Sequence, residues 1–261
     1  MDYIPDTSVI VDGRFTKYIA KIKSDSRVII SEALIAEVEH QDELIGDSAF
    51  ALSGGIDSSL LFSVLGNGKH AYCVGVKGSQ DFVYAEELCI SLRANLTKIY
   101  VENSDVIECT RIVKSVDPGI SFLDLGFETV LTIILSRISE EALVTGQGAD
   151  EIFYGYRKFS DGREESNINS LDKLYKITLP RERKIAEYFG KKLITPYLEN
   201  GIPEYFSTLD RKVHLNDLNN KLIIREAGRM SGLPESIFNR GKKAAQYGTG
   251  IKKVQEKLGL K

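Results

Sequence analysis

Short apolar runs alternate with segments of helical periodicity along most of the chain. Four of the apolar runs predict buried strands, and they cover residues 49–52, 71–76, 97–101 and 141–145. Between them, residues 84–96 repeat apolar side chains at helical spacing, and a long helix is expected near 121–139. This alternation predicts an α/β fold in which helices cover both faces of a parallel sheet. Ligands are then expected at the carboxyl ends of the strands, and residues 165–261 are expected to be mostly helical.

The start of the chain has a different pattern. Residues 27–30 (RVII) are strand-like, and Ser31 stands where the N-cap of a following helix is expected. A polar junction, QDELIGDS, then leads into the main body at residues 41–48. We therefore divide the chain into an N-terminal appendage, residues 1–44, and a main domain, residues 45–261.

Composition narrows the class of protein. Hydrophobic residues make up 43% of the 261 residues and charged residues 27%, which is ordinary for a folded globular chain. Three cysteines without a CxxC pair fit neither a disulfide framework nor a zinc ribbon. A net charge of −3 gives no electrostatic case for nucleic-acid binding. No apolar stretch approaches the length of a membrane span, and the acidic N-terminus does not resemble an export signal, so we expect a cytoplasmic protein without a membrane partner.

The strongest local signal is SGGIDSS at residues 53–59, between a predicted strand and a predicted helix. Adjacent glycines let a ligand approach the backbone, while the helix N-terminus and the hydroxyls of Ser53 and Ser58 provide an anion site. Asp57 would repel a phosphate unless it holds a Mg²⁺ ion that bridges phosphate oxygens. The alternative is a tight turn in which Asp57 and Ser58 only cap the helix.

This segment resembles the signature of the PP-loop ATP pyrophosphatases, which cleave ATP to AMP and pyrophosphate and adenylate a substrate. It is not a Walker A loop. Further segments resemble the synthetase domain of asparagine synthetases in the same order along the chain, with β-lactam synthetase as a related case. These segments are VGVKGSQD (74–81), TGQGADEIFYGYRKF (145–159), ITPYLE (194–199), KLIIREA (221–227) and LPESIFNRGKKAAQYGTGI (233–251). The fold implied is a Rossmann-like PP-loop domain, of the adenine nucleotide alpha hydrolase type, with a helical C-terminal part.

The resemblance implies a set of site residues. Asp57 and Asp150 would be ligands of Mg²⁺, although Asp150 could instead cap a helix in GADEIF. Lys242 would stabilise the charge that grows as an amine attacks the acyl-adenylate, with Lys243 as its neighbouring candidate and a solvated basic patch as the alternative. The residues that would bind ATP are Leu52, Ser53, Gly54, Gly55, Asp57, Ser58, Val74, Thr145 and Gly146.

Some positions depart from the family pattern. The glutamate of its GEG segment is Gln147 here, so a neutral amide replaces a carboxylate that helps to form the acyl-adenylate. The glutamate and arginine before the proline of the family's RVPFLD segment are Lys192 and Ile194. These changes put aspartate in doubt as the acceptor, whereas the phosphate loop is intact. We assign Gln147 a catalytic role beside Lys242.

The start of the chain bears on the nitrogen source. Glutaminase domains of this family use a cysteine directly after Met1, but position 2 is Asp2 here. We therefore expect nitrogen to come from ammonia, from a substrate amine or from a separate glutaminase subunit. IPDTSVIVDGRF and VIISEALIAEVEHQ resemble the opening of a PIN nuclease domain, with Asp6 and Glu37 as its metal ligands. The main domain leaves no room for the rest of that fold, so we expect a structural appendage.

The sequence favours an ATP-dependent ligase that adenylates a small carboxylate and transfers ammonia or an amine to it, as in asparagine biosynthesis. Three alternatives stay open: a PP-loop enzyme that modifies tRNA or another substrate, an ATP-binding partner subunit with altered chemistry, and a fusion with a PIN-type ribonuclease. Some relatives that thiolate tRNA use cysteine pairs, but Cys73, Cys89 and Cys109 fall on apolar positions typical of packing. The acceptor and the oligomeric state are not determined by the sequence.

Overall fold

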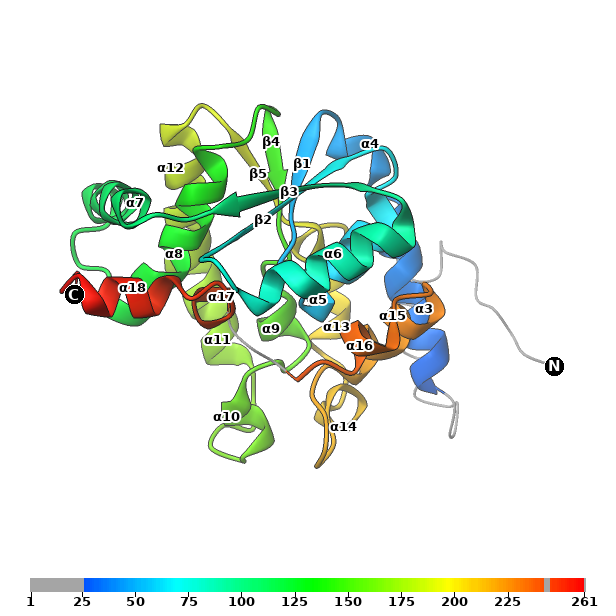
Figure 1. Ribbon diagram of the computed structural model, residues 1–261. Coiled ribbons are helices and arrows are strands. Elements are labelled where there is room, and N and C mark those ends of the chain that lie inside the picture. Colours follow the sequence, from blue (N-terminus) through cyan, green and yellow to red (C-terminus); the bar gives the residue numbers. More distant parts are fainter. Residues whose placement is uncertain (1–25, 242–244, 261) are drawn as a thin grey trace.

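A computed structural model describes residues 26–241 and 245–260 of the chain. Its five strands form one sheet in the order β3-β2-β1-β4-β5, in which every neighbouring pair is parallel (Figure 1). The strands are β1 (Ser48–Ala51), β2 (His70–Gly75), β3 (Asn95–Tyr100), β4 (Ala142–Val144) and β5 (Lys192–Ile194). The parallel sheet and the α/β class are thus confirmed.

Helices connect the strands and surround the sheet. Those before and between the first four strands are α3 (Ser26–Glu39), α4 (Asp42–Ile45), α5 (Ile56–Leu65), α6 (Gln80–Leu92), α7 (Asn103–Val116) and α8 (Phe122–Leu135). Between β4 and β5 lie α9 (Ala149–Ile152), α10 (Arg157–Ser160), α11 (Ile168–Lys173), a π-helical turn (Leu174–Thr178) and α12 (Leu179–Tyr188). After β5 come a 3₁₀ turn (Pro196–Leu198), α13 (Ile202–Phe206), α14 (Arg211–His214), α15 (Leu222–Met230), α16 (Glu235–Phe238), α17 (Ala245–Gly248) and α18 (Ile251–Lys257).

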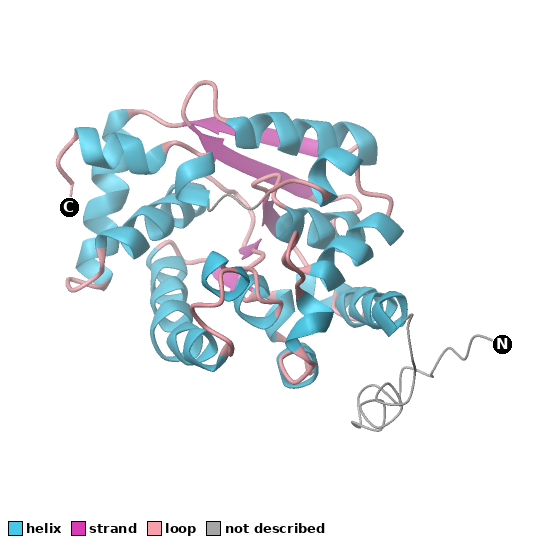
Figure 2. Cartoon of the chain, turned by 90° about the horizontal axis from the view of Figure 1, so that it is seen from below, coloured by secondary structure: helices cyan, strands magenta, loops and turns pink. Residues whose placement is uncertain are grey.

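The order in which strands are added reverses at β1, the central strand of the sheet. β1 pairs with β2 on one side and with β4 on the other, so Phe50 is in register with both Ala71 and Val144. In a parallel sheet, such a switch point opens a crevice at the carboxyl ends of the strands, where ligands bind. The segments that follow β1 and β4, which lead into α5 and α9, therefore border this crevice. In Figure 1 both helices lie below the strands that they follow, and Figure 2 looks at the molecule from that side.

Two hydrophobic cores cover the two faces of the sheet. Alternate residues of a strand point to opposite faces, so Phe50 joins the core under α5 and α15, while Ala49 joins the core under α8 and α12. Ile30, Leu34 and Val38 of α3 are fully buried in the first core. Helix α3 lies beside α15 in Figure 1, where blue and orange ribbons meet. The Ser31 hydroxyl of α3 donates a hydrogen bond to the carbonyl oxygen of Ile223 in α15, although 192 residues separate the two.

The strand predicted at residues 27–30 is wrong, and so is the N-cap at Ser31. Both lie inside α3, where the Ser31 hydroxyl donates to the carbonyl oxygen of Arg27 one turn earlier. The β-branched run Val28–Ile30 suggested a strand, but the spacing of four residues between the buried Ile30 and Leu34 puts them on one helical face. The division of the chain at residue 45 stays a prediction, and residues 1–25 lie outside the described part.

Candidate functional site

The predicted phosphate loop lies where expected, between β1 and the N-terminus of α5. Gly54 has a φ of +63°, and a Cβ there would overlap Tyr84 Cβ and lie 2.9 Å from the backbone nitrogen of Ala85, so the loop passes too close to α6 for any side chain. The Ser53 hydroxyl accepts a hydrogen bond from the Gly55 N–H at 3.3 Å, and Ser58 Oγ accepts one from the Ser53 N–H at 3.3 Å. These bonds hold the loop in a fixed shape before any ligand arrives.

The structure brings the two predicted metal ligands together around a lysine. Asp57 is in the first turn of α5 and Asp150 is in α9, which follow different strands of the sheet. Lys221 Nζ lies 2.6 Å from Asp57 Oδ2 and 2.5 Å from Asp150 Oδ1, and its side chain is only 5% exposed. Burial by itself lowers the pKa of Lys221, but the charges of Asp150 and Asp57 outweigh it and raise the pKa above its usual value. Lys221 is therefore an ammonium held between two carboxylates.

Local backbone geometry places Lys221 at this point. Lys221 is the N-cap residue of α15, and its φ of +57° is in the left-handed region, which is uncommon for a side-chain-bearing residue. Gly155 packs against the pair, because a Cβ there would overlap both Asp150 Oδ1 and Lys221 Cε. In the sequence, Lys221 stands out only as the first residue of KLIIREA. A lysine before an amphipathic helix gives no signal of its own, so this residue was missed.

The segment after β4 borders the phosphate loop. A Cβ on Gly146 would lie 3.2 Å from both Asp57 Cβ and the Ser58 backbone nitrogen, so Gly146 leaves a narrow space beside the start of α5. The hydroxyl oxygen of Thr145 is buried and has no hydrogen-bond partner among the residues that the structure describes. A buried hydroxyl of this kind can donate to or accept from a bound nucleotide. Gly146 thus lies beside the phosphate loop, and the binding of a nucleotide by Thr145 and Gly146 stays a prediction.

Two other nucleotide-binding candidates contribute mainly to packing. Leu52 is buried in the core beneath α5, and its N–H donates to the carbonyl oxygen of Tyr72 at the end of β1. Val74 lies within β2 and packs its side chain into the core beneath α8. Both residues lie toward the carboxyl ends of the central strands, and their side chains make apolar contacts. Their part in nucleotide binding stays a prediction.

Gln147 is half-buried in the same segment and contacts a residue that the sequence analysis did not identify. Its Nε2 donates a hydrogen bond of 2.6 Å to Glu182 Oε1, which comes from α12. Glu182 is 2% exposed, and burial, assisted by the charges of Glu128 and Glu151, raises its pKa well above the usual range. The Gln147 amide is therefore held from beneath by a buried carboxyl group.

The donor set fits ATP and Mg²⁺, the two groups that the PP-loop resemblance implies. Asp57 and Asp150 both direct oxygens at one point, and paired carboxylates that share the ion with phosphate oxygens are the usual protein ligands of Mg²⁺. No cluster of three or more His, Cys, Asp or Glu side chains suited to a metal occurs within residues 26–241 and 245–260. A Mg²⁺ ion at this site would thus depend on the phosphates for the rest of its shell.

Comparison with known proteins agrees with this geometry. Residues 46–174 match the family model described as asparagine synthase. Over these residues the chain is similar to the asparagine synthase family. Its relatives include a protein of Methanocaldococcus jannaschii that is named as a glutamine-hydrolyzing asparagine synthetase, 26% identical over 80% of this chain and 47% of that protein. The glutamine-hydrolyzing asparagine synthetase of Gallus gallus is 23% identical over 90% of this chain and 44% of that protein. The chain thus spans about half the length of these curated relatives.

Among solved structures, the NMN synthetase from Francisella tularensis is similar with a TM-score of 0.46 and 14% identity. The similarity covers 91% of this chain and 88% of that one. The resemblance to the asparagine synthase family that the motifs indicated is confirmed over residues 46–174, and this region holds the phosphate loop, Gln147 and Asp150. Among the described residues, no helix is long and apolar enough to cross a membrane.

The C-terminal segment of this asparagine synthase-like chain reaches back to the phosphate loop. Arg240 Nη1 donates to the carbonyl oxygen of Ser53 at 3.1 Å, and Arg240 Nη2 lies 2.8 Å from Asp81 Oδ1. Its guanidinium also lies over the Tyr84 ring, 4.1 Å from the centroid. The sequence does not point to Arg240, because nothing in LPESIFNRGKK separates it from the two lysines that follow.

The predicted catalytic Lys242 and its neighbour Lys243 lie outside the described residues. The chain on either side of them is anchored beside the site. Arg240 holds one side, and on the other the Val76 N–H at the end of β2 donates to the carbonyl oxygen of Thr249 at 2.9 Å. The carbonyl oxygen of Gly248 also accepts a hydrogen bond of 2.8 Å from the Ser79 hydroxyl. Both anchors attach the segment at the carboxyl ends of β1 and β2.

The PIN-like residues and the cysteines do not form a second site among the described residues. Glu37 is buried on α3, where burial raises its pKa and His40 partly offsets the rise, while Asp6 lies outside the described part. All three cysteines are buried. Burial raises the pKa of Cys89 to about 11 and that of Cys109 to about 12, so the reactive thiolate is scarce at neutral pH.

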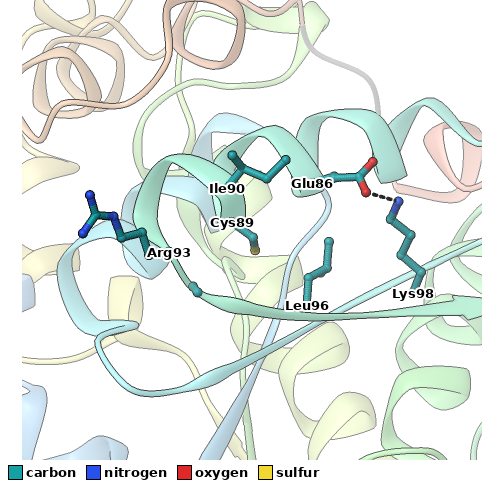
Figure 3. Close-up of a pocket in the computed structure, with 7 residues that line it drawn as sticks. Glu86, Cys89, Ile90, Arg93, Leu96 and Lys98 are labelled. Carbon is teal, nitrogen blue, oxygen red and sulfur yellow. Dashed lines mark ion pairs between the residues drawn. The ribbon is translucent and has the colours of Figure 1, made fainter.

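An open depression lies on the surface between α6 and β3, away from the carboxyl ends of the strands (Figure 3). Figure 3 shows Cys89 and Leu96 facing each other across it, while Glu86 and Lys98 form an ion pair of 2.8 Å at one side. Its lining includes Arg93, which ends α6 in the left-handed conformation. None of the predicted site residues lines it.

Proposed function

We propose that this chain is an ATP-dependent ligase that forms AMP and pyrophosphate and joins ammonia or an amine to a substrate carboxylate. The observation that carries the proposal is the convergence of Asp57 and Asp150 on Lys221 beside a preformed phosphate loop. The match to the asparagine synthase family over residues 46–174 supports it.

The first step would take place over the loop. A carboxylate oxygen of the substrate attacks the α-phosphorus of ATP, the bond to the β-phosphate oxygen breaks, and pyrophosphate leaves with that electron pair. The loop N–H groups, the hydroxyls of Ser53 and Ser58 and the N-terminus of α5 would bind the phosphates. Asp57 and Asp150 would hold Mg²⁺, which supplies positive charge to the phosphate oxygens when bound. Leu52, Val74, Thr145 and Gly146 would frame the nucleotide.

The second step would transfer nitrogen. The lone pair of ammonia or an amine forms a bond to the acyl carbon, AMP leaves with the electrons of the C–O bond, and the proton lost by nitrogen passes to solvent. Lys242 would stabilise the oxyanion of the transition state. Holding both reactants in one crevice makes this step effectively unimolecular. Free ammonia, a substrate amine or a separate glutaminase subunit would supply the nitrogen.

The half-reactions can be tested without knowing the acceptor. Purified protein is incubated with ATP, Mg²⁺ and a panel of small carboxylates that includes aspartate, with and without ammonium chloride, and the nucleotide products are resolved. We expect AMP and pyrophosphate in the presence of one class of carboxylate. ADP as the product, or no cleavage with any carboxylate, would overturn the proposal.

A nucleotide-binding partner subunit is the second candidate, and Gln147 is the observation that favours it, because an amide replaces the family carboxylate. A subunit of this kind binds ATP but does not release pyrophosphate. Binding of ATP measured by calorimetry, alongside the product assay, separates the two functions.

A further inference from the structure

The pairing of Gln147 with Glu182 determines which end of the Gln147 amide faces its surroundings. An amide side chain has one donating end and one accepting end. The donating Nε2 is directed at Glu182 Oε1 at 2.6 Å, so the accepting carbonyl oxygen lies on the opposite side of the group. Gln147 is half-buried at the carboxyl end of β4, whereas Glu182 is 2% exposed beneath it. The hydrogen bond between the two residues thus connects the buried interior to the segment beside the phosphate loop.

Charged residues from three helices act on the pKa of Glu182. Glu128 faces it from α8, Glu151 from α9, and Arg181 precedes it on α12. Arg181 Nε lies 2.9 Å from Glu128 Oε1 and its Nη1 lies 2.9 Å from Asp117 Oδ2. Burial, then Glu128 and Glu151, raise the pKa of Glu182, and Arg181 only partly offsets them. A carboxyl oxygen accepts a hydrogen bond in either protonation state, so the contact with Gln147 does not depend on the charge of Glu182.

Two further features distinguish the position of Glu182. Glu182 Oε2 is buried and has no hydrogen-bond partner within the described part of the chain, which is costly for a polar atom. The helix that carries Glu182 begins directly after the π-helical turn Leu174–Thr178, and Pro180 at its first turn lacks a backbone donor. Turns of this type are frequent at functional sites. A residue that served packing alone would be better satisfied by an apolar side chain.

We propose that Glu182 is the positioning residue for nitrogen transfer: it fixes the Gln147 amide so that the carbonyl oxygen accepts an N–H of the incoming ammonia or amine. The inference rests on the proposed ligase function. With Nε2 engaged by Glu182, the amide cannot turn its donating end to the nucleophile. An accepting oxygen holds a nitrogen that carries hydrogens and leaves the nitrogen lone pair directed away from the amide. Gln147 would then orient the nucleophile without taking its proton.

Two substitutions at Glu182 separate positioning from other roles. Glu182→Met has a similar size but no acceptor, so Gln147 Nε2 loses its partner and the amide can rotate. Glu182→Gln keeps an accepting oxygen and should keep the orientation. The control is Glu187→Gln on the exposed face of the same helix. Each variant is assayed for pyrophosphate exchange, which follows adenylation, and for amide formation with ammonium chloride and the carboxylate that the panel selects.

We expect Glu182→Met to lower amide formation about tenfold and to raise the KM for ammonium, with pyrophosphate exchange changed less than about twofold. Glu182→Gln and Glu187→Gln should behave like the wild type. Equal loss of both half-reactions in Glu182→Met, or no loss in either, would overturn the inference. A Glu182→Gln variant as impaired as Glu182→Met would also overturn it, because Glu182 would then act as a base.

A double variant guards against a folding defect. If Glu182 acts through Gln147, adding Glu182→Met to Gln147→Ala should cause no further loss of amide formation, whereas independent roles would multiply the two losses. Thermal unfolding of each variant shows that it is folded. A wild type that releases no pyrophosphate with any carboxylate rejects the ligase function itself. An active wild type whose Glu182→Met variant matches the Glu187→Gln control rejects only the role of Glu182.

Discussion

Lys221 Nζ lies 2.6 Å from Asp57 Oδ2, so the first helix after the phosphate loop is tied to a residue 164 positions later in the chain. Asp150 contacts the same nitrogen at 2.5 Å. The lysine occupies the place toward which a bridging cation would be drawn. Without it, two carboxylates at the carboxyl ends of neighbouring strands would repel each other.

Replacing Lys221 with methionine should therefore make stability depend on Mg²⁺. Removing one partner of a buried ion pair usually costs about 3–5 kcal/mol. Asp57 and Asp150 are about a quarter exposed and partly solvated, which reduces the expected cost to about 1–3 kcal/mol in metal-free buffer. Urea unfolding with and without MgCl₂ measures the effect. Magnesium should restore more stability to Lys221→Met than to the wild type or to the exposed control Lys253→Met. An equal response in all three would contradict this account.

Asp57→Asn should reduce pyrophosphate release mainly by weakening Mg²⁺ binding. The amide keeps the size of the side chain but removes the charge that draws a hard cation. Activity should recover in part as the Mg²⁺ concentration is raised, whereas the exposed control Asp47→Asn should follow the wild-type titration. A loss that does not respond to Mg²⁺ would indicate that Asp57 acts through its ion pair with Lys221 and not through the metal.

Gly54→Ala should abolish ATP binding and destabilise the fold. The new Cβ would overlap Tyr84 and would also sit at a φ of +63°. Strained backbone of this type costs about 1–2 kcal/mol, and the overlap with α6 adds to it. Gly68→Ala has a φ of +71° with nothing near its Cβ, so it reports the cost of the dihedral alone. Calorimetric ATP titration and thermal unfolding compare the two. The clash would be disproved if both variants lost the same stability.

His214 should make the protein sensitive to mild acid. It is fully buried against Phe153 and Tyr154, and burial lowers its pKa to about 4 from a usual value of 6.5. The unfolded chain then binds a proton that the folded chain does not, so stability is lost as the pH falls from about 6.5 toward 4.

The loss from this group approaches about 3 kcal/mol at the acid end of that range. His214→Phe should remove this loss of stability. Urea midpoints measured between pH 7 and pH 4 would then change less with pH for this variant than for the wild type. The exposed control His40→Phe should keep the wild-type slope. Parallel profiles for His214→Phe and the wild type would refute the assignment.

The sequence predicted the central strands because each is a short apolar run between turn-forming residues. Phe50 and Val144 carry this signal on the strand pair that borders the crevice. It failed for β5, whose three residues are only partly buried and include Lys192. It also failed for α3, where a β-branched run hid a helical spacing that only the packing against α15 makes clear.

For the site, local chemistry was visible and distant pairing was not. Glycines and hydroxyls close together in SGGIDSS identify a loop, because the ligand is bound by neighbouring backbone groups. Lys221, Glu182 and Arg240 act through partners that lie 35 or more residues away in the chain. No periodicity or spacing encodes such a contact, so the residues that hold the site in shape emerge only from the fold.

Gly155 bears on how this site can change by mutation. The hydrogen at its Cα faces Asp150 and the end of the Lys221 side chain, and any larger side chain would push the two apart. A substitution at 155 should therefore be tolerated only with a second change that shortens or removes Lys221. Libraries that randomise one of these positions at a time will find neither variant. A library that varies positions 155 and 221 together should recover double variants that fold. Such paired changes would show that the two residues are in contact in the folded protein.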